Sequence, residues 1–164
     1  RIYGLNTIVF RQSCIYGPRQ FGIEDQGWIA WFIIATMFKQ QITIYGNGKQ
    51  VRDLLYIDDL LDAYEMSAKN IKKTRGQIYN IGGGVKNTIS VWNELHPKLS
   101  NLFKKEIHVV FSSQRPGDQP IFIADIRKAK KDFNWEPKVA IDEGLEKIFL
   151  WMQSNKNLIK KVFA

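Results

Sequence analysis

The sequence predicts an α/β fold, because short β-rich runs alternate with longer segments of helical periodicity along its 164 residues. β-branched and aromatic residues gather between turn residues in five runs, which we expect to form strands at 7–10, 42–45, 52–57, 77–81 and 107–111. Apolar residues recur at helical spacing in five segments, which we expect to form helices at 26–40, 58–70, 90–103, 125–133 and from 141 or 142 onward. A chain of this length suits one domain with a core of ordinary size.

Turn and capping residues set the limits of the first elements. The loop at 13–22 carries two glycines and a proline, so it separates the first strand from the first helix. Asp25 is expected to cap that helix, which is apolar on most faces and therefore deeply packed. A Gly-Asn-Gly turn at 46–48 leads into the third strand, and Asp58 or Asp59 is expected to cap the helix that follows.

The second half of the chain is divided in the same way. Ser90 is expected to cap a helix that Pro97 kinks or splits. The segment 112–120 is a polar loop, and Asp125 is expected to cap the next helix. The last residues, 155–164, form a basic and amphipathic tail.

Charge and cysteine content narrow the class of protein. The formal net charge of +8 favours an anionic partner, which could be nucleic acid, acidic lipid or a phosphorylated small molecule. The longest apolar stretch, Trp28–Phe38, is too short to cross a bilayer. The single cysteine, Cys14, excludes an internal disulfide and a cysteine-cluster metal site, which fits a reducing cytoplasm. The chain starts at Arg1 and runs into a buried-looking strand, so we expect it to begin inside a larger protein.

Two arginines are the strongest candidates for ligand binding. Arg52 follows the Gly-Asn-Gly turn and opens a strand, so a rigid element would hold its planar fork, which can bind phosphate through two parallel hydrogen bonds. Arg115 stands in an Arg-Pro-Gly-Asp loop that proline stiffens, although an exposed loop arginine is often without function. Asp118 could orient Arg115 or bind a sugar or ribose hydroxyl. We interpret the two arginines as a pair that binds the diphosphate of a nucleotide sugar from two sides.

Other motifs are better explained by structure than by chemistry. The triple glycine at 82–84 lacks the final glycine of a dinucleotide fingerprint, which favours a plain turn. Tyr45 and Lys49 match the letters Y-x-x-x-K, but two glycines between them argue against the helix that this catalytic pair needs. His96 and His108 have no ligand partners at metal spacing, so we predict no metal site. The aromatic residues at 28, 31 and 32 have the spacing of core residues more than of a ligand platform.

In order along the chain, several segments resemble the C-terminal half of the extended short-chain dehydrogenases/reductases that act on nucleotide sugars. The segments are 10–18, 46–59 with its G-x-G-x-Q-x-R-D and D-D letters, 79–82, 115–118, 124–128 and 135–137. The resemblance implies the last sheet strands of a Rossmann-type fold plus a small α/β substrate-binding lobe, over the whole of residues 1–164. Residues 1–11 and 52–81 would belong to the sheet region. Within the family, 11–21 and 24–32 most resemble epimerases that act at C2 of the sugar.

The resemblance also implies roles for individual residues. Arg52 and Arg115 would hold the diphosphate, with Tyr45 near the base, Asp118 near the ribose and Gln26 near the sugar. Ser13, Cys14 and Tyr16 would face NAD, which the family binds mainly through its N-terminal half. The family's catalytic tyrosine, lysine and serine or threonine are expected upstream of this chain, so the chain alone should turn over no substrate.

Two other functions stay open on the sequence alone. The chain could belong to a different nucleotide-sugar epimerase or dehydratase, for example one that acts on UDP-glucose. It could also be a basic nucleic-acid-binding module, since lysines cluster at 72–73, 104–105, 128–131 and 160–161. The partners that we expect are a nucleotide-diphosphate sugar and a second copy of the chain, with no nucleic acid and no membrane.

Overall fold

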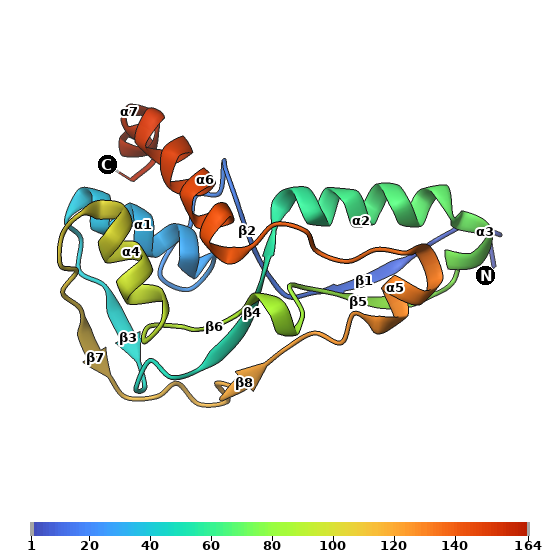
Figure 1. The fold of residues 1–164 in the computed structure, drawn as a ribbon, viewed down its shortest axis with the longest axis horizontal. Helices are drawn as coiled ribbons and strands as arrows, with labels where there is room; N and C mark the ends of the chain where they lie inside the picture. Colours follow the sequence, from blue (N-terminus) through green and yellow to red (C-terminus); the bar gives the residue numbers. More distant parts are fainter. Residues whose placement is uncertain (1, 164) are drawn as a thin grey trace.

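The computed structural model describes residues 2–163, which form a mixed α/β fold drawn out along one axis (Figure 1). In chain order the elements are β1 (Val9–Gln12), β2 (Cys14–Tyr16), α1 (Trp28–Phe38), β3 (Thr43–Tyr45), β4 (Val51–Tyr56), α2 (Ile57–Lys69), α3 (Ile71–Thr74), β5 (Ile78–Ile81), the 3-10 turn η1 (Val85–Asn87), β6 (Thr88–Ser90), α4 (Leu95–Phe103), β7 (Val110–Ser112), β8 (Ile121–Phe122), α5 (Arg127–Phe133), α6 (Ile141–Ser154) and α7 (Lys156–Phe163). Of the expected strands, the one at 107–111 lies further along the chain, as β7, and the short strands β2, β6 and β8 were not expected.

Strand β4 connects the parts of the fold. It pairs in parallel with β2 and β8 and antiparallel with β6. Two further parallel pairs flank this sheet, β1 with β5 and β3 with β7. Parallel neighbours need crossover connections, and helices supply most of them here, as the alternation in the sequence predicted. The strand that carries Arg52 is therefore held on both edges.

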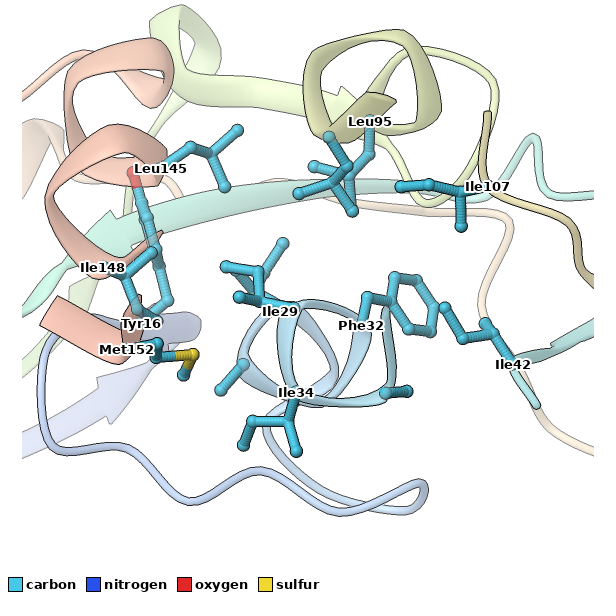
Figure 2. Packing of buried hydrophobic residues seen from close by; sticks show 14 of the residues in the cluster. Tyr16, Ile29, Phe32, Ile34, Ile42, Leu95, Ile107, Leu145, Ile148 and Met152 are labelled. Carbon is cyan, nitrogen blue, oxygen red and sulfur yellow. The ribbon is translucent and has the colours of Figure 1, made fainter. Parts of the chain in front are cut away.

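Two hydrophobic cores lie on opposite faces of β4. Because side chains alternate along a strand, Leu54 faces one core and Leu55 the other. The larger core is formed by α1, α4 and α6, and Figure 2 shows α1 residues Ile29, Phe32 and Ile34 packed among side chains from the other two helices. The smaller core lies between α2, β5 and α5, which run along one end of the molecule in Figure 1.

The smaller core contains a segment that was expected to belong to the lobe. Ala129, Phe133 and Trp135 are buried there against Tyr79 and Leu60. The segment around α5 therefore packs on the sheet end of the molecule, although only 1–11 and 52–81 were assigned to it.

Three of the expected helix caps are wrong. Helix α1 begins after Gly27, which adopts a left-handed conformation with φ of 73° and gives no side-chain cap, so Asp25 is free for another role. Helix α2 also lacks a side-chain cap, and the Asp59 carboxylate instead accepts hydrogen bonds from the backbone of Lys138 and Val139, both at 3.0 Å. Ser90 belongs to β6, and its hydroxyl accepts a hydrogen bond from the backbone N–H of Glu94 ahead of α4.

The two remaining helix predictions concern the cap at Asp125 and the effect of Pro97. Arg127 is the first residue of α5, and its backbone N–H donates a hydrogen bond to the Asp125 carboxylate at 3.1 Å. Pro97 lies in the first turn of α4, where a missing N–H costs no helical hydrogen bond, so the helix continues through it to Phe103. Over residues 2–163, no helix combines the length and the apolar character needed to cross a membrane.

Candidate functional site

The candidate site is an open pocket of about 420 Å³ beside the end of β4. Segments far apart in the sequence contribute to it: β2, the loop before α1, α1 itself, β3, β4 and the loop at 115–118. The lining residues are Cys14, Glu24, Asp25, Trp28, Phe32, Thr43, Ile44, Tyr45, Gln50, Arg52, Val91, Arg115, Pro116, Gly117 and Asp118. Arg52 and Arg115, 63 positions apart in the sequence numbering, thus share one pocket.

Arg52 is held rigidly on β4. One terminal nitrogen donates to the Asp118 carboxylate at 2.6 Å, and the other donates to the backbone carbonyl of Val51 at 2.8 Å. The Gln50 side chain donates to the same Asp118 carboxylate at 3.1 Å and to the backbone carbonyl of Tyr45 at 2.6 Å. Arg52 is only 15% exposed, so its guanidinium presents a fixed, partly desolvated charge to the pocket.

Arg115 approaches the pocket from the 115–118 loop. Its guanidinium carbon lies 3.8 Å from the centre of the Tyr45 ring, and one terminal nitrogen lies 2.8 Å from the Asp25 carboxylate. Gly117 has φ of 78°, and the backbone N–H of Asp118 donates to the carbonyl of Arg115 at 3.2 Å, so this segment is a tight turn. The turn therefore holds Arg115 and Asp118 on the same side of the pocket.

The other end of the pocket is more apolar. Trp28 and Phe32 stack edge to face with ring centres 5.8 Å apart, and the Trp28 indole N–H points at the Cys14 sulfur, 3.5 Å away. Burial raises the pKa of the Cys14 thiol, while the hydrogen bond from Trp28 acts in the opposite direction. The thiol is therefore a neutral, weakly polar group beside the two aromatic rings.

The structure does not bring all of the predicted residues to the pocket. Cys14, Tyr45, Arg52, Arg115 and Asp118 line it, whereas Ser13, Tyr16 and Gln26 do not. Tyr16 is 1% exposed and lies in the larger core, with its hydroxyl 3.4 Å from the carbonyl of Ile141 on α6 (Figure 2). Gly144 leaves room for that hydroxyl, because a Cβ there would overlap it.

The position of Gln26 is fixed by backbone hydrogen bonds in the turn before α1. It exchanges two backbone hydrogen bonds with Ile23, at 2.9 and 3.1 Å, and these bonds close a tight turn. The two residues at the tip of that turn, Glu24 and Asp25, are the ones that line the pocket. The predicted role of Gln26 near the sugar stays a prediction.

Ser13 belongs to a buried network centred on Asp53, which follows Arg52 on β4 and is fully buried. The Ser13 hydroxyl donates to one Asp53 carboxylate oxygen. The other oxygen accepts the backbone N–H groups of Gly84 at 3.0 Å and Ala124 at 3.2 Å. One carboxylate thereby joins the end of β1, the glycine turn at 82–84 and the segment after β8. The turn at 82–84 packs tightly on β4, because a Cβ at Gly83 would overlap the carbonyl oxygen of Leu54.

Sequence reasoning missed several residues of the site. Glu24 was given no role, Asp25 was assigned to a helix cap, and Trp28 and Phe32 were treated as core residues. Gln50 was part of a recognised motif but received no role. The sequence signals for these residues are their places in the segments 24–32 and 46–59 and the spacing of Trp28 and Phe32, which puts both on one face of α1.

Two of the rejected motifs can be checked directly. Tyr45 ends β3, and Gly46 and Gly48 follow with φ of 81° and 72°, so Tyr45 and Lys49 do not lie on a helix. His96 packs against Trp92, with ring centres 4.9 Å apart. Among the described residues, no group of three or more histidines, cysteines, aspartates or glutamates is placed to hold a metal ion.

The lysine clusters are partly neutralised. Lys73 lies 3.3 Å from the Asp132 carboxylate, and Lys130 lies 2.6 Å from that of Glu136. The exposed Lys130 pair contributes little to stability, but both pairs lower the free positive charge of the surface.

The fold is a Rossmann-type α/β fold, and two arginines from distant parts of the sequence line its pocket. A family model described as GDP-mannose 4,6 dehydratase matches residues 1–148, and the chain belongs to this family of nucleotide-sugar epimerases and dehydratases. The predicted family resemblance and fold class are thereby confirmed.

Individual relatives agree with this assignment. The chain is 40% identical over 159 residues to a CDP-paratose 2-epimerase of Salmonella typhi, covering 94% of this chain and 47% of the relative. It is 37% identical to a UDP-glucuronate 4-epimerase of Thermodesulfobacterium geofontis, covering 98% and 47%. The chain thus spans about half the length of the curated relatives that it matches.

Solved structures show the same fold. A UDP-glucose 4-epimerase of Thermotoga maritima, crystallised with UDP-glucose, superposes with a TM-score of 0.82 at 32% identity, covering 94% of this chain and 48% of the other. A UDP-glucuronic acid 4-epimerase of Bacillus cereus, in complex with UDP-glucuronic acid and NAD, gives a TM-score of 0.81 at 28% identity, covering 92% and 46%.

Proposed function

We propose that this chain is the substrate-binding portion of an NAD-dependent nucleotide-sugar epimerase, most specifically a CDP-paratose 2-epimerase. The main support for this proposal is that Arg52 and Arg115 line the same pocket. Two guanidinium groups that face the same space suit a diphosphate, because each can bind one phosphate through two parallel hydrogen bonds. The 40% identity to a CDP-paratose 2-epimerase supports the choice within the family.

Two carboxylates of the pocket orient the arginines, and one of them would give way to a phosphate. In the structure Asp118 holds Arg52 and Asp25 holds Arg115, so both guanidinium groups are oriented before a ligand arrives. Asp25 is 78% exposed, and an exposed ion pair costs little to break, so a phosphate can replace it at Arg115. Asp118 is also held by Gln50 and would stay beside Arg52, where it can accept a ribose hydroxyl.

The residues of this chain fit NAD only in part. Of the three residues predicted to face the cofactor, Cys14 lines the pocket, Ser13 is bonded to Asp53, and Tyr16 is buried in the core. We therefore propose that the part of the relatives that this chain does not match binds most of NAD. When bound, NAD would supply the hydride acceptor for oxidation at C2 of the sugar. Trp28 and Phe32 would shield that end of the pocket from water.

The proposal predicts that the chain binds CDP at least tenfold more tightly than CMP. CDP can meet both arginines, whereas CMP offers one phosphate, and a charge-assisted hydrogen bond contributes roughly 1.5–3 kcal/mol. Isothermal titration of the chain with each nucleotide measures the two affinities.

A single-stranded DNA titration at two salt concentrations tests the rival nucleic-acid function. We expect DNA to bind more weakly than CDP at both concentrations. Tight DNA binding with a steep salt dependence, together with equal affinities for CDP and CMP, would contradict the proposal.

A further inference from the structure

The turn before α1 places two carboxylates on the rim of the pocket. Residues 23–26 form a tight turn closed by the two backbone hydrogen bonds between Ile23 and Gln26. Its two central residues are both acidic, and both line the pocket. Asp25 is paired with Arg115, whereas one carboxylate oxygen of Glu24 accepts the Tyr45 hydroxyl at 3.0 Å. Glu24 is therefore held by a neutral hydroxyl, whereas Asp25 is held by a cation.

A series of contacts gives the order of the groups along the pocket. Cys14 on β2 stands opposite Leu54 of β4, two residues beyond Arg52. Arg52 is joined to Asp118, Asp118 to Gln50, and Gln50 to the backbone of Tyr45. Glu24 follows, through the Tyr45 hydroxyl. Cys14, with Trp28 against it, thus adjoins the Arg52 side of the pocket, and Tyr45, with Glu24 on its hydroxyl, lies against Arg115. We place the two ends of a ligand whose diphosphate lies between the arginines at these two groups.

We propose, on the basis of the proposed function, that Glu24 selects the base of the nucleotide and favours cytosine over uracil. A carboxylate is an acceptor only, and the second oxygen of Glu24 has no recorded partner among the described residues. Cytosine carries an amino donor at its N4 position, where a pyrimidine with a 4-oxo group carries an acceptor. The amino group can donate to Glu24, whereas the oxygen of uracil would face a negative charge. Tyr45 is the positioning residue that holds Glu24 toward the base.

The test compares the affinities of CDP and UDP for three forms of the chain. The first is the natural chain, the second is Glu24→Gln, and the third is the matched control Glu65→Gln on α2, whose carboxylate is paired with Lys69 outside the pocket. We expect the natural chain to bind CDP about tenfold more tightly than UDP, the ratio for one charge-assisted hydrogen bond. In Glu24→Gln the amide can donate to uracil as well as accept from cytosine, so the ratio should fall to within about twofold. The control should keep the ratio of the natural chain.

The outcomes separate this inference from the proposed function. Equal binding of CDP and UDP by the natural chain would overturn the role of Glu24 and leave diphosphate binding intact. A CDP preference that survives in Glu24→Gln would place base selection elsewhere. Failure of the natural chain to bind either nucleotide would overturn the proposed function itself. Glu24 is exposed on a turn, and an unchanged melting temperature of Glu24→Gln would show that the variant is folded.

Discussion

Replacing Arg52 with alanine is expected to weaken CDP binding about 100-fold. The substitution removes a fixed, partly buried guanidinium and leaves the Asp118 carboxylate unpaired beside the phosphate site. Loss of charge-assisted hydrogen bonds at roughly 1.5–3 kcal/mol accounts for a factor of this size, and repulsion from Asp118 adds to it. Arg52→Lys should lose about tenfold, because lysine keeps the charge but not the planar fork. Isothermal titration with CDP measures each effect.

Arg127→Ala is the matched control for Arg52. Its side chain is 90% exposed, and its guanidinium is paired with Asp125 outside the pocket. The control should bind CDP as the natural chain does. Equal affinities for Arg52→Ala and Arg127→Ala would show that Arg52 does not contact the ligand.

Replacing Asp53 with alanine is expected to lower the free energy of unfolding by about 3–5 kcal/mol. The Asp53 carboxylate is the acceptor for the backbone N–H groups of Gly84 and Ala124 and for the Ser13 hydroxyl, and it is fully buried. Each buried donor left without a partner costs roughly 1–3 kcal/mol. Urea unfolding followed by circular dichroism measures the difference between the variant and the natural chain.

Asp58→Ala provides the comparison for Asp53. Asp58 is exposed in the first turn of α2, where a negative charge interacts favourably with the helix dipole. Its loss should cost no more than about 1 kcal/mol. Similar losses in the two variants would mean that the network around Asp53 does not stabilise the fold.

The parts of the fold that were predictable depend on local patterns. The segment at 46–59 was predictable because a turn, an apolar strand and a helix each leave a signal within a few residues. Long-range contacts leave none. Asp25 and Asp59 precede or begin helices and so resemble caps, but their carboxylates bind Arg115 and the backbone at 138–139, far along the chain. Local sequence therefore predicted the two helices next to Asp25 and Asp59, but not the partners of their carboxylates.

The same reasoning explains the outcome for the site. Arg52 follows a Gly-Asn-Gly turn at the start of a strand, and Arg115 stands in a loop stiffened by proline, so both could be found from their neighbours. Tyr16 was assigned to the cofactor because of its place in a family motif. Side chains alternate along β2, so Tyr16 points into the larger core, on the same face of the strand as Cys14. Glu24 lies in the recognised segment 24–32 but was given no role, because its contact with Tyr45 depends on the turn at 23–26.

A crystal structure of the chain with CDP would test the central proposal most directly. We predict that oxygens of one diphosphate lie within hydrogen-bond distance of both the Arg52 and the Arg115 guanidinium groups, with Asp25 displaced from Arg115. A diphosphate bound away from this pocket, with both arginines still paired to their aspartates, would contradict it.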